Sequence, residues 1–310
     1  MSRTSFNELL ESGAHFGHLK RKWNPAMAPF IFTEKNGIHI IDLNKTVAKL
    51  EEACAALKQI TRSGKKVLFV ATKKQAKDIV AERVKAVGMP YVTERWPGGM
   101  LTNFATIRKA VRKMGSIDKM AIDGTFENLS KKEKLMLSRE RAKLEHNLGS
   151  IADLTRLPAA IFIIDIVKEH IAVAEAKRLG IPTFAIVDTN ADPNKVDYAI
   201  PANDDASTSI KLITEIVCRA IAEGLDERKI DKDKADEEKE EMTDEQRSAQ
   251  NLSDEEEETK GGDRKPGLLK RKPATTGAPG KPGDKGKSGP QGGRGGPRGG
   301  AGGPSRPRRA

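Results

Sequence analysis

The stretch Ala160-Ile-Phe-Ile-Ile164 decides the fold, because it is short, apolar throughout and rich in β-branched residues. Lys66-Val-Leu-Phe-Val-Ala71 and Thr183-Phe-Ala-Ile-Val187 have the same character. Runs of this kind are typical of central parallel strands that are covered on both faces. Pro90-Tyr-Val-Thr93 and Tyr198-Ala-Ile200 predict shorter, outer strands. The sequence therefore predicts one parallel sheet.

Stretches of helical period lie between these strands. Apolar residues recur on one face over residues 47–60, 76–84 and 171–179, and a glycine follows each stretch, as is common at helix C-termini. A last core helix is expected to begin at Ser207 and to end before Gly224. The alternation of strand and helix predicts right-handed βαβ units and a doubly wound α/β fold.

One part of the chain breaks the alternation. Residues 102–148 contain two helical stretches and no strand, with the turn Asp123-Gly124 between them. Ser130-Lys-Lys-Glu133 opens the second stretch with a capping-box pattern. Because the apolar side chains of the two stretches can face each other, we expect an antiparallel helical hairpin that projects from the sheet. The α/β core then comprises residues 1–101 and 149–225.

The C-terminal part of the chain differs in composition from the core. Residues 226–260 hold 16 acidic and 7 basic residues, and residues 261–310 hold 13 basic and 2 acidic residues together with 16 of the 28 Gly. Neither part can bury enough apolar surface to offset its chain entropy. We expect an acidic disordered linker over 226–260 and a Gly/Pro/Arg-rich, basic, disordered tail over 261–310.

Charge and cysteine usage restrict the function. The 55 Lys and Arg exceed the 44 Asp and Glu, for a net charge of +11, and so basic a chain suits a polyanion. Only Cys54 and Cys218 occur, which excludes a disulfide framework and a zinc ribbon. No window approaches the ~18 apolar residues of a membrane span. An RNA-binding protein of the cytoplasm is expected.

A long N-terminal stretch has no secondary-structure period and is typical of a functional loop. It reads Leu10-Glu-Ser-Gly-Ala-His-Phe-Gly-His-Leu19, continued by Trp23-Asn-Pro-Ala-Met-Ala-Pro-Phe-Ile-Phe32. This stretch closely resembles the N-terminal signature of the second protein of the bacterial small ribosomal subunit. Motifs at 95–103, 157–170, 186–193 and 200–205 are similar to that family in the same order, so that the resemblance covers essentially residues 1–225.

The resemblance implies a flavodoxin-like α/β core with a protruding coiled-coil hairpin. It further implies a non-enzymatic, structural role in the small ribosomal subunit. The implied partners are the small-subunit ribosomal RNA and neighbouring ribosomal proteins, including the large OB-repeat protein that captures messenger RNA. Neither DNA nor a membrane is an expected partner, and no cofactor is required. The family usually ends soon after the last core helix, so the tail departs from its pattern.

Basic and loop residues are the candidates for RNA contact. Trp96-Pro-Gly-Gly-Met100 joins a strand to a helix, and successive glycines beside Arg95 can aim several N–H groups at one phosphate. A tight turn with Trp96 as a core anchor explains the motif equally well. The RNA-binding candidates are His15, His18, Lys20, Arg21, Lys22, Trp23, Lys73, Lys74, Arg95, Gly98, Gly99, Asn103, Arg108, Lys109, Arg112, Lys113, Lys131 and Lys132.

Five aspartates fall at or just beyond the C-terminal ends of predicted strands: Asp165, Asp188, Asp192, Asp204 and Asp205. We expect these carboxylates to converge at one rim of the sheet, where they attract a cation or raise one another's pKa. A Mg²⁺ or Zn²⁺ site would use Asp188, Asp204 and Asp205, with His18 as an added ligand. Capping of backbone N–H groups by the same aspartates is the alternative explanation.

Two other functions stay open from the residues alone. One is a cation-dependent enzyme that acts on phosphorylated substrates in the acidic pocket, and the other is an RNA-binding regulator outside the ribosome. Against the enzyme, no GxxxxGK[ST] or GxGxxG loop occurs between a strand and a helix, and no nucleophile–base pair is evident. Sedimentation distinguishes the regulator from a ribosomal protein, because only a ribosomal protein stays with the small subunit through a gradient.

Overall fold

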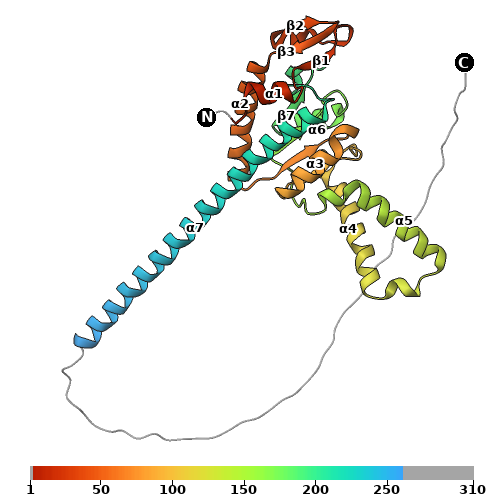
Figure 1. Cartoon of the computed structure of the whole chain (residues 1–310). Helices are drawn as coiled ribbons and strands as arrows, with labels where there is room; N and C mark the ends of the chain where they lie inside the picture. Colours follow the sequence, from red (N-terminus) through yellow and green to blue (C-terminus); the bar gives the residue numbers. More distant parts are fainter. Residues whose placement is uncertain (1–2, 261–310) are drawn as a thin grey trace, which may run out of the picture. The chain divides into compact units, whose positions relative to one another are not determined.

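The five predicted strands form one parallel sheet in the order β5-β4-β6-β7-β8. Figure 1 shows the chain, with β7 of this sheet labelled. The strands are β4 Val67–Val70, β5 Tyr91–Val92, β6 Ala160–Ile163, β7 Thr183–Val187 and β8 Tyr198–Pro201. This order, 2-1-3-4-5 along the chain, is that of a doubly wound sheet whose direction of winding reverses between β4 and β6. Ligands of such sheets bind beyond the carboxyl ends of the strands at the reversal.

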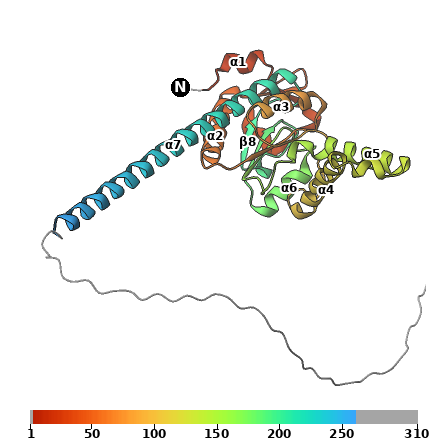
Figure 2. The ribbon, with the colours of Figure 1, turned by 90° about the horizontal axis from the view of Figure 1, so that it is seen from below.

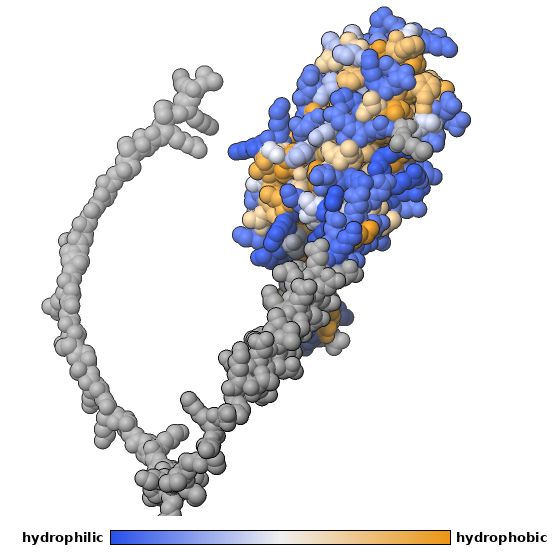
Figure 3. Space-filling model, turned by 90° about the vertical axis from the view of Figure 1, so that its left-hand side faces the viewer, coloured by the Kyte–Doolittle hydropathy of each residue, from blue (hydrophilic) through white to orange (hydrophobic). Residues whose placement is uncertain are grey.

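The structure is a computed structural model that describes residues 3–260, with side chains described for residues 3–126 and 128–234. The chain divides into one unit of residues 1–249 and a second unit of residues 250–310. The predicted tail over 261–310 lies outside the described residues. No helix within the described residues is long and apolar enough to cross a membrane. The face in Figure 3 is mainly hydrophilic, with small separate hydrophobic areas.

Helices cover both faces of the sheet, as the alternation predicted (Figure 2). Side chains from α2 Leu43–Arg62, α3 Lys74–Ala86 and the beginning of α7 Ser207–Lys260 pack on one face with Phe69 of β4. On the other face Leu68 of β4 packs with side chains of α6 His170–Leu179. Successive strand residues therefore enter two separate cores, which is why these strands are apolar throughout.

Two helices, α4 Phe104–Ile122 and α5 Lys131–Leu148, occupy the place of the predicted hairpin. The predicted capping box is confirmed, because the Ser130 side chain accepts from Glu133 N–H and the Glu133 carboxylate accepts from Ser130 N–H. Gly124 adopts φ +70° in the connecting turn, ahead of the 3-10 turn η3 Thr125–Asn128. At the root, η4 Gly149–Ile151 leads back to the sheet.

The N-terminal part contains a small sheet that the sequence analysis missed. Its antiparallel strands are β1 Phe16–Leu19, β2 Ile31–Lys35 and β3 Ile38–Ile41, in the order β1-β3-β2. Asn36 and Gly37 both have positive φ, 55° and 75°, in the two-residue turn of the β2–β3 hairpin. Asn-Gly between short apolar runs is a strong hairpin signal, and it was available in the sequence. The remaining short elements are α1 Phe6–Glu11, η1 Lys20–Lys22, η2 Pro25–Phe30 and η5 Pro193–Lys195.

The last helix differs from the prediction. α7 begins at Ser207 as expected but passes through Gly224 and continues to Lys260, so the expected disordered linker over 226–260 is helical. Gly224 lies inside α7 and does not end it. A Cβ on this residue would lie 2.3 Å from Thr61 Oγ1, so glycine is what permits the close approach of α7 to α2. Between Gly224 and Lys260 the chain has no Pro or Gly and is rich in Glu and Lys, which are good helix formers.

Candidate functional site

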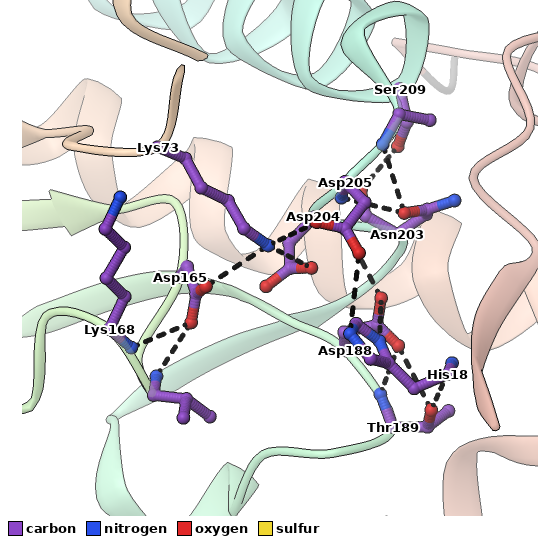
Figure 4. A network of polar contacts seen from close by, with 12 residues as sticks. His18, Lys73, Asp165, Lys168, Asp188, Thr189, Asn203, Asp204, Asp205 and Ser209 are labelled. Carbon is purple, nitrogen blue, oxygen red and sulfur yellow. Dashed lines mark hydrogen bonds and ion pairs between the residues drawn. The ribbon is translucent and has the colours of Figure 1, made fainter. Parts of the chain in front are cut away.

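Polar side chains converge at the carboxyl-end rim of the parallel sheet, as the sequence predicted (Figure 4). Lys73 follows β4 as the N-cap residue of α3, and Asp165 follows β6. Asp188 follows β7, and Asp204 and Asp205 follow β8. Four neighbouring strands thus deliver one lysine and four aspartates to the place where doubly wound sheets bind ligands.

Lys73 lies at the centre of this group, which we term the rim cluster: His18, Lys73, Asp165, Asp188, Asp204 and Asp205. Its Nζ atom is 2.8 Å from Asp204 Oδ1, 2.8 Å from Asp205 Oδ1 and 3.1 Å from Asp165 Oδ2. Only 14% of the Lys73 side chain is exposed. Lys73 was predicted as an RNA contact, and its pairing with three carboxylates does not favour that role.

His18 joins the rim cluster from the N-terminal sheet. Its Nδ1 atom lies 3.1 Å from Asp188 Oδ2, and its Nε2 atom lies 3.4 Å from Asp205 Oδ2. The His18 backbone N–H donates to Thr189 Oγ1 at 2.8 Å. A Cβ on Gly17 would lie 2.6 Å from Thr189 Cγ2, so only glycine allows this approach. These contacts hold Gly17 and His18 of β1 against the loop after β7.

The buried charges of the rim cluster shift one another's pKa. Burial, together with the charges of Asp188 and Asp165, raises the pKa of Asp204 to about 7 despite the nearby Lys73. The hydrogen bond to Asp188 holds the pKa of His18 above its usual value, against partial burial. Burial opposes the charged form of Lys73, but the surrounding carboxylates outweigh it and raise the pKa of the ammonium. The surroundings of the cluster therefore favour the protonated forms of Asp204, His18 and Lys73 more than water does.

The predicted metal ligands are only partly assembled. Ligand atoms of His18, Asp188 and Asp204 lie within 4.8 Å of one another, whereas Asp205 is not in this group. The ammonium of Lys73 supplies the positive charge that converging carboxylates require, so the geometry accounts for the cluster without a metal ion. Asp192 lies apart from the rim cluster and accepts from Asn194 N–H in the turn after β7, as the capping explanation predicted.

The Trp-Pro-Gly-Gly turn is occupied by a carboxylate of the chain itself. Glu175 on α6 accepts hydrogen bonds from the backbone N–H groups of Gly99, Leu101 and Thr102, at 2.7, 2.9 and 3.1 Å. The predicted phosphate contact at Gly99 is not favoured, because its N–H already donates to Glu175. The alternative explanation is confirmed, since Gly99 has φ +83° and Trp96 is buried.

Several other RNA-binding candidates have partners within the chain. Lys20 pairs with Glu34 at 2.7 Å, Lys113 pairs with Glu140, and Arg108 donates to the Leu154 carbonyl at 3.1 Å. The Trp23 ring lies 5.1 Å from the His39 ring. His15 Nδ1 is buried without a hydrogen-bond partner in the described residues, and burial lowers the pKa of this side chain.

The remaining basic candidates are exposed and make no ion pair with any described residue. They are Arg21, Lys22, Lys74, Arg95, Lys109, Arg112, Lys131 and Lys132. Asn103 is exposed and forms the N-cap position of α4, with its side chain bonded to Thr106 Oγ1 at 2.8 Å. Gly98 is exposed beside it. These positions stay predictions for RNA contact.

Comparison with known proteins decides the family. The family model of ribosomal protein S2 matches residues 9–224. The chain belongs to the ribosomal protein S2 family. A small ribosomal subunit protein uS2 of Phocaeicola vulgatus is 72% identical over 232 residues, which are 75% of this chain and 83% of that protein. The protein of the same name from Bacteroides thetaiotaomicron is 70% identical over 75% of this chain and 84% of that protein.

Membership of the S2 family makes the chain a ribosomal protein with a structural role, and not an enzyme. The family match ends at Gly224, inside α7, so it covers the α/β core and both hairpin helices. The part of α7 beyond Gly224 and residues 261–310 lie outside the family match.

Proposed function

We propose that the chain is a constituent of the small ribosomal subunit in the cytoplasm and that it binds ribosomal RNA mainly through the hairpin α4–α5. Neighbouring ribosomal proteins, among them the OB-repeat protein that captures messenger RNA, are its proposed protein partners. The hairpin helices are proposed to pack as a short coiled coil within a flavodoxin-like fold. RNA recognition relies on backbone phosphates and shape, because aromatic residues are only 4% of the chain.

The observation that carries the proposal is the difference between paired and unpaired cations. Lys73 is only 14% exposed and is compensated by aspartates, whereas Lys109 and Arg112 on α4 and Lys131 and Lys132 on α5 are exposed without described ion-pair partners. Exposed cations on a protruding element are available to phosphates, and each neutralised phosphate releases condensed counterions. The four side chains therefore form the proposed phosphate-contacting set.

The proposal is tested by replacing Lys109, Arg112, Lys131 and Lys132 together by Ala. Binding to small subunits that lack this protein is then measured at several salt concentrations. We expect weaker binding and a salt slope that is smaller by up to ~3, since each contact contributes somewhat less than one unit.

A matched control replaces four other exposed lysines by Ala: Lys65, Lys85, Lys177 and Lys211. It removes the same charge from the core and should leave most of the binding and of the salt slope. Equal losses in both variants would mean that net charge, and not the hairpin, determines binding.

A further inference from the structure

We propose that Glu175 is a positioning residue, which fixes the direction of the hairpin α4–α5 relative to the sheet by acting as an internal anion in the turn at the hairpin root. The inference rests on the proposed binding of RNA by the hairpin. It adds a buried residue that the sequence analysis did not single out.

The Glu175 carboxylate gathers five hydrogen bonds from one turn. Oε1 accepts from Gly99 N–H at 2.7 Å and from Trp96 Nε1 at 3.2 Å. Oε2 accepts from Leu101 N–H at 2.9 Å and from the N–H and hydroxyl of Thr102, each at 3.1 Å. Charge-assisted bonds of this kind are stronger than bonds between neutral groups.

The turn is built to receive an anion. Gly99 adopts φ +83°, which directs the surrounding N–H groups to one side, as in the backbone nests that hold phosphates. Glu175 is itself a buried side chain on α6, with 8% exposure. Burial alone would raise the pKa of Glu175, but the donors of Thr102, Leu101 and Gly99 outweigh it and hold this pKa below its usual value. The carboxylate is therefore charged at neutral pH.

The turn that donates hydrogen bonds to Glu175 lies directly before α4. Thr102 lies two residues before Phe104, the first residue of α4, so the bonded turn is the point from which the hairpin departs. Apolar packing of Trp96, Leu148 and Ile151 also holds the root, but burial is not directional. Hydrogen bonds weaken steeply away from good geometry. The bonds to the carboxylate therefore fix the orientation of the hairpin relative to the sheet, which apolar contacts alone do not fix.

The experiment uses the full chain with one spin label on each part: Gln75→Cys on α3 and Ser138→Cys on α5, both at exposed positions. Cys54 and Cys218 remain in place, because burial raises the pKa of both thiols to about 12 and keeps them unreactive. Distance distributions are measured by pulsed electron paramagnetic resonance for the native residue, Glu175→Ala and Glu175→Gln. The Gln variant keeps the side-chain size, so it reports on the bonds even where the Ala variant does not fold.

We expect a narrow distribution with Glu175 and a broader one in both variants. Assembly of both variants into small subunits should fall about tenfold, if roughly a tenth of their molecules hold the hairpin in the direction that binds RNA. Glu223→Gln is the matched control, because it removes a carboxylate on α7 that pairs with Arg3 at 2.5 Å. This variant should have a lower Tm but an unchanged width of the distance distribution. An unchanged distribution in folded Glu175→Gln overturns the proposal. A broadened distribution with undiminished assembly upholds the positioning role and counts instead against RNA binding by the hairpin.

Discussion

The ammonium nitrogen of Lys73 lies 2.8 Å from Oδ1 of Asp204, a carboxylate that is 1% exposed. Charges this deeply placed are stable only when they are paired, because removing one partner leaves the other uncompensated in a medium of low polarity. Lys73 therefore has the role in the rim cluster that the sequence suggested for a metal ion.

Replacing Lys73 by Met should destabilise the protein by ~3 kcal/mol, since breaking a buried pair leaves an uncompensated charge. The measurement is chemical unfolding at pH 7. Lys74→Met is the matched control, because Lys74 is the next residue, is exposed and should change stability by less than ~0.5 kcal/mol. Mg²⁺ should raise the Tm of Lys73→Met more than that of the native protein, since a cation can then approach the carboxylates. Equal Mg²⁺ effects on the two proteins would contradict this role of Lys73.

Asp204 should make stability fall as pH rises. Its pKa is about 7 in the folded protein and near 3.8 when unfolded, so the folded state binds the proton more tightly over this interval. The stabilisation is complete below pH ~3.8 and is lost as pH approaches 7. Unfolding free energies of the native protein and Asp204→Asn, measured from pH 4 to pH 8, should show the native protein losing stability relative to the variant. A constant difference would contradict the shift.

Gly224 and Gly115 offer a paired test of helix glycines. A Cβ on Gly224 would lie 2.6 Å from the Lys58 carbonyl oxygen, whereas a Cβ on Gly115 in α4 meets nothing within 4 Å. Gly224→Ala should cost ~1–3 kcal/mol by overpacking against α2. Gly115→Ala should stabilise by up to ~1 kcal/mol, because Ala is the better helix former. Thermal melts check both, and a neutral Gly224→Ala would mean that α2 and α7 can separate without cost.

The helical continuation of α7 makes a prediction about truncation. Lys58 lies 2.6 Å from Glu227, and Arg62 lies 2.9 Å from Asp231, so both residues of α2 pair with α7 beyond the family match. A chain ending at Leu225 should fold but have a slightly lower Tm than one ending at Lys234, since surface ion pairs contribute little. The difference should shrink at high salt. An identical Tm at low salt would show that this part of α7 adds nothing to the core.

Much of the fold could be predicted because its signals are local. The runs at 67–70, 160–163 and 183–187 are strands because both of their faces are buried, and the capping box at Ser130 begins a helix through contacts within one turn. The Asn36-Gly37 hairpin was missed although its signal was equally local. Convergence of the aspartates at one rim was predictable for a related reason: parallel strands end at the same edge of a sheet.

The partners of charged residues could not be predicted, because they come from distant parts of the chain. Lys73 and Asp204 are separated by more than a hundred residues, and Glu175 reaches Gly99 from a different helix. Gly224 has the same local appearance as a helix-ending glycine, and only α2 packed against it explains why it is needed. Sequence by itself determined the five strands of the parallel sheet, the helices between them, the acidic rim and the family likeness, since these depend on short-range pattern. Only the tertiary structure shows which cations already have an ion-pair partner and which N–H groups already have an acceptor within the chain. Ion pairs and hydrogen bonds depend on distances between residues that only folding brings together.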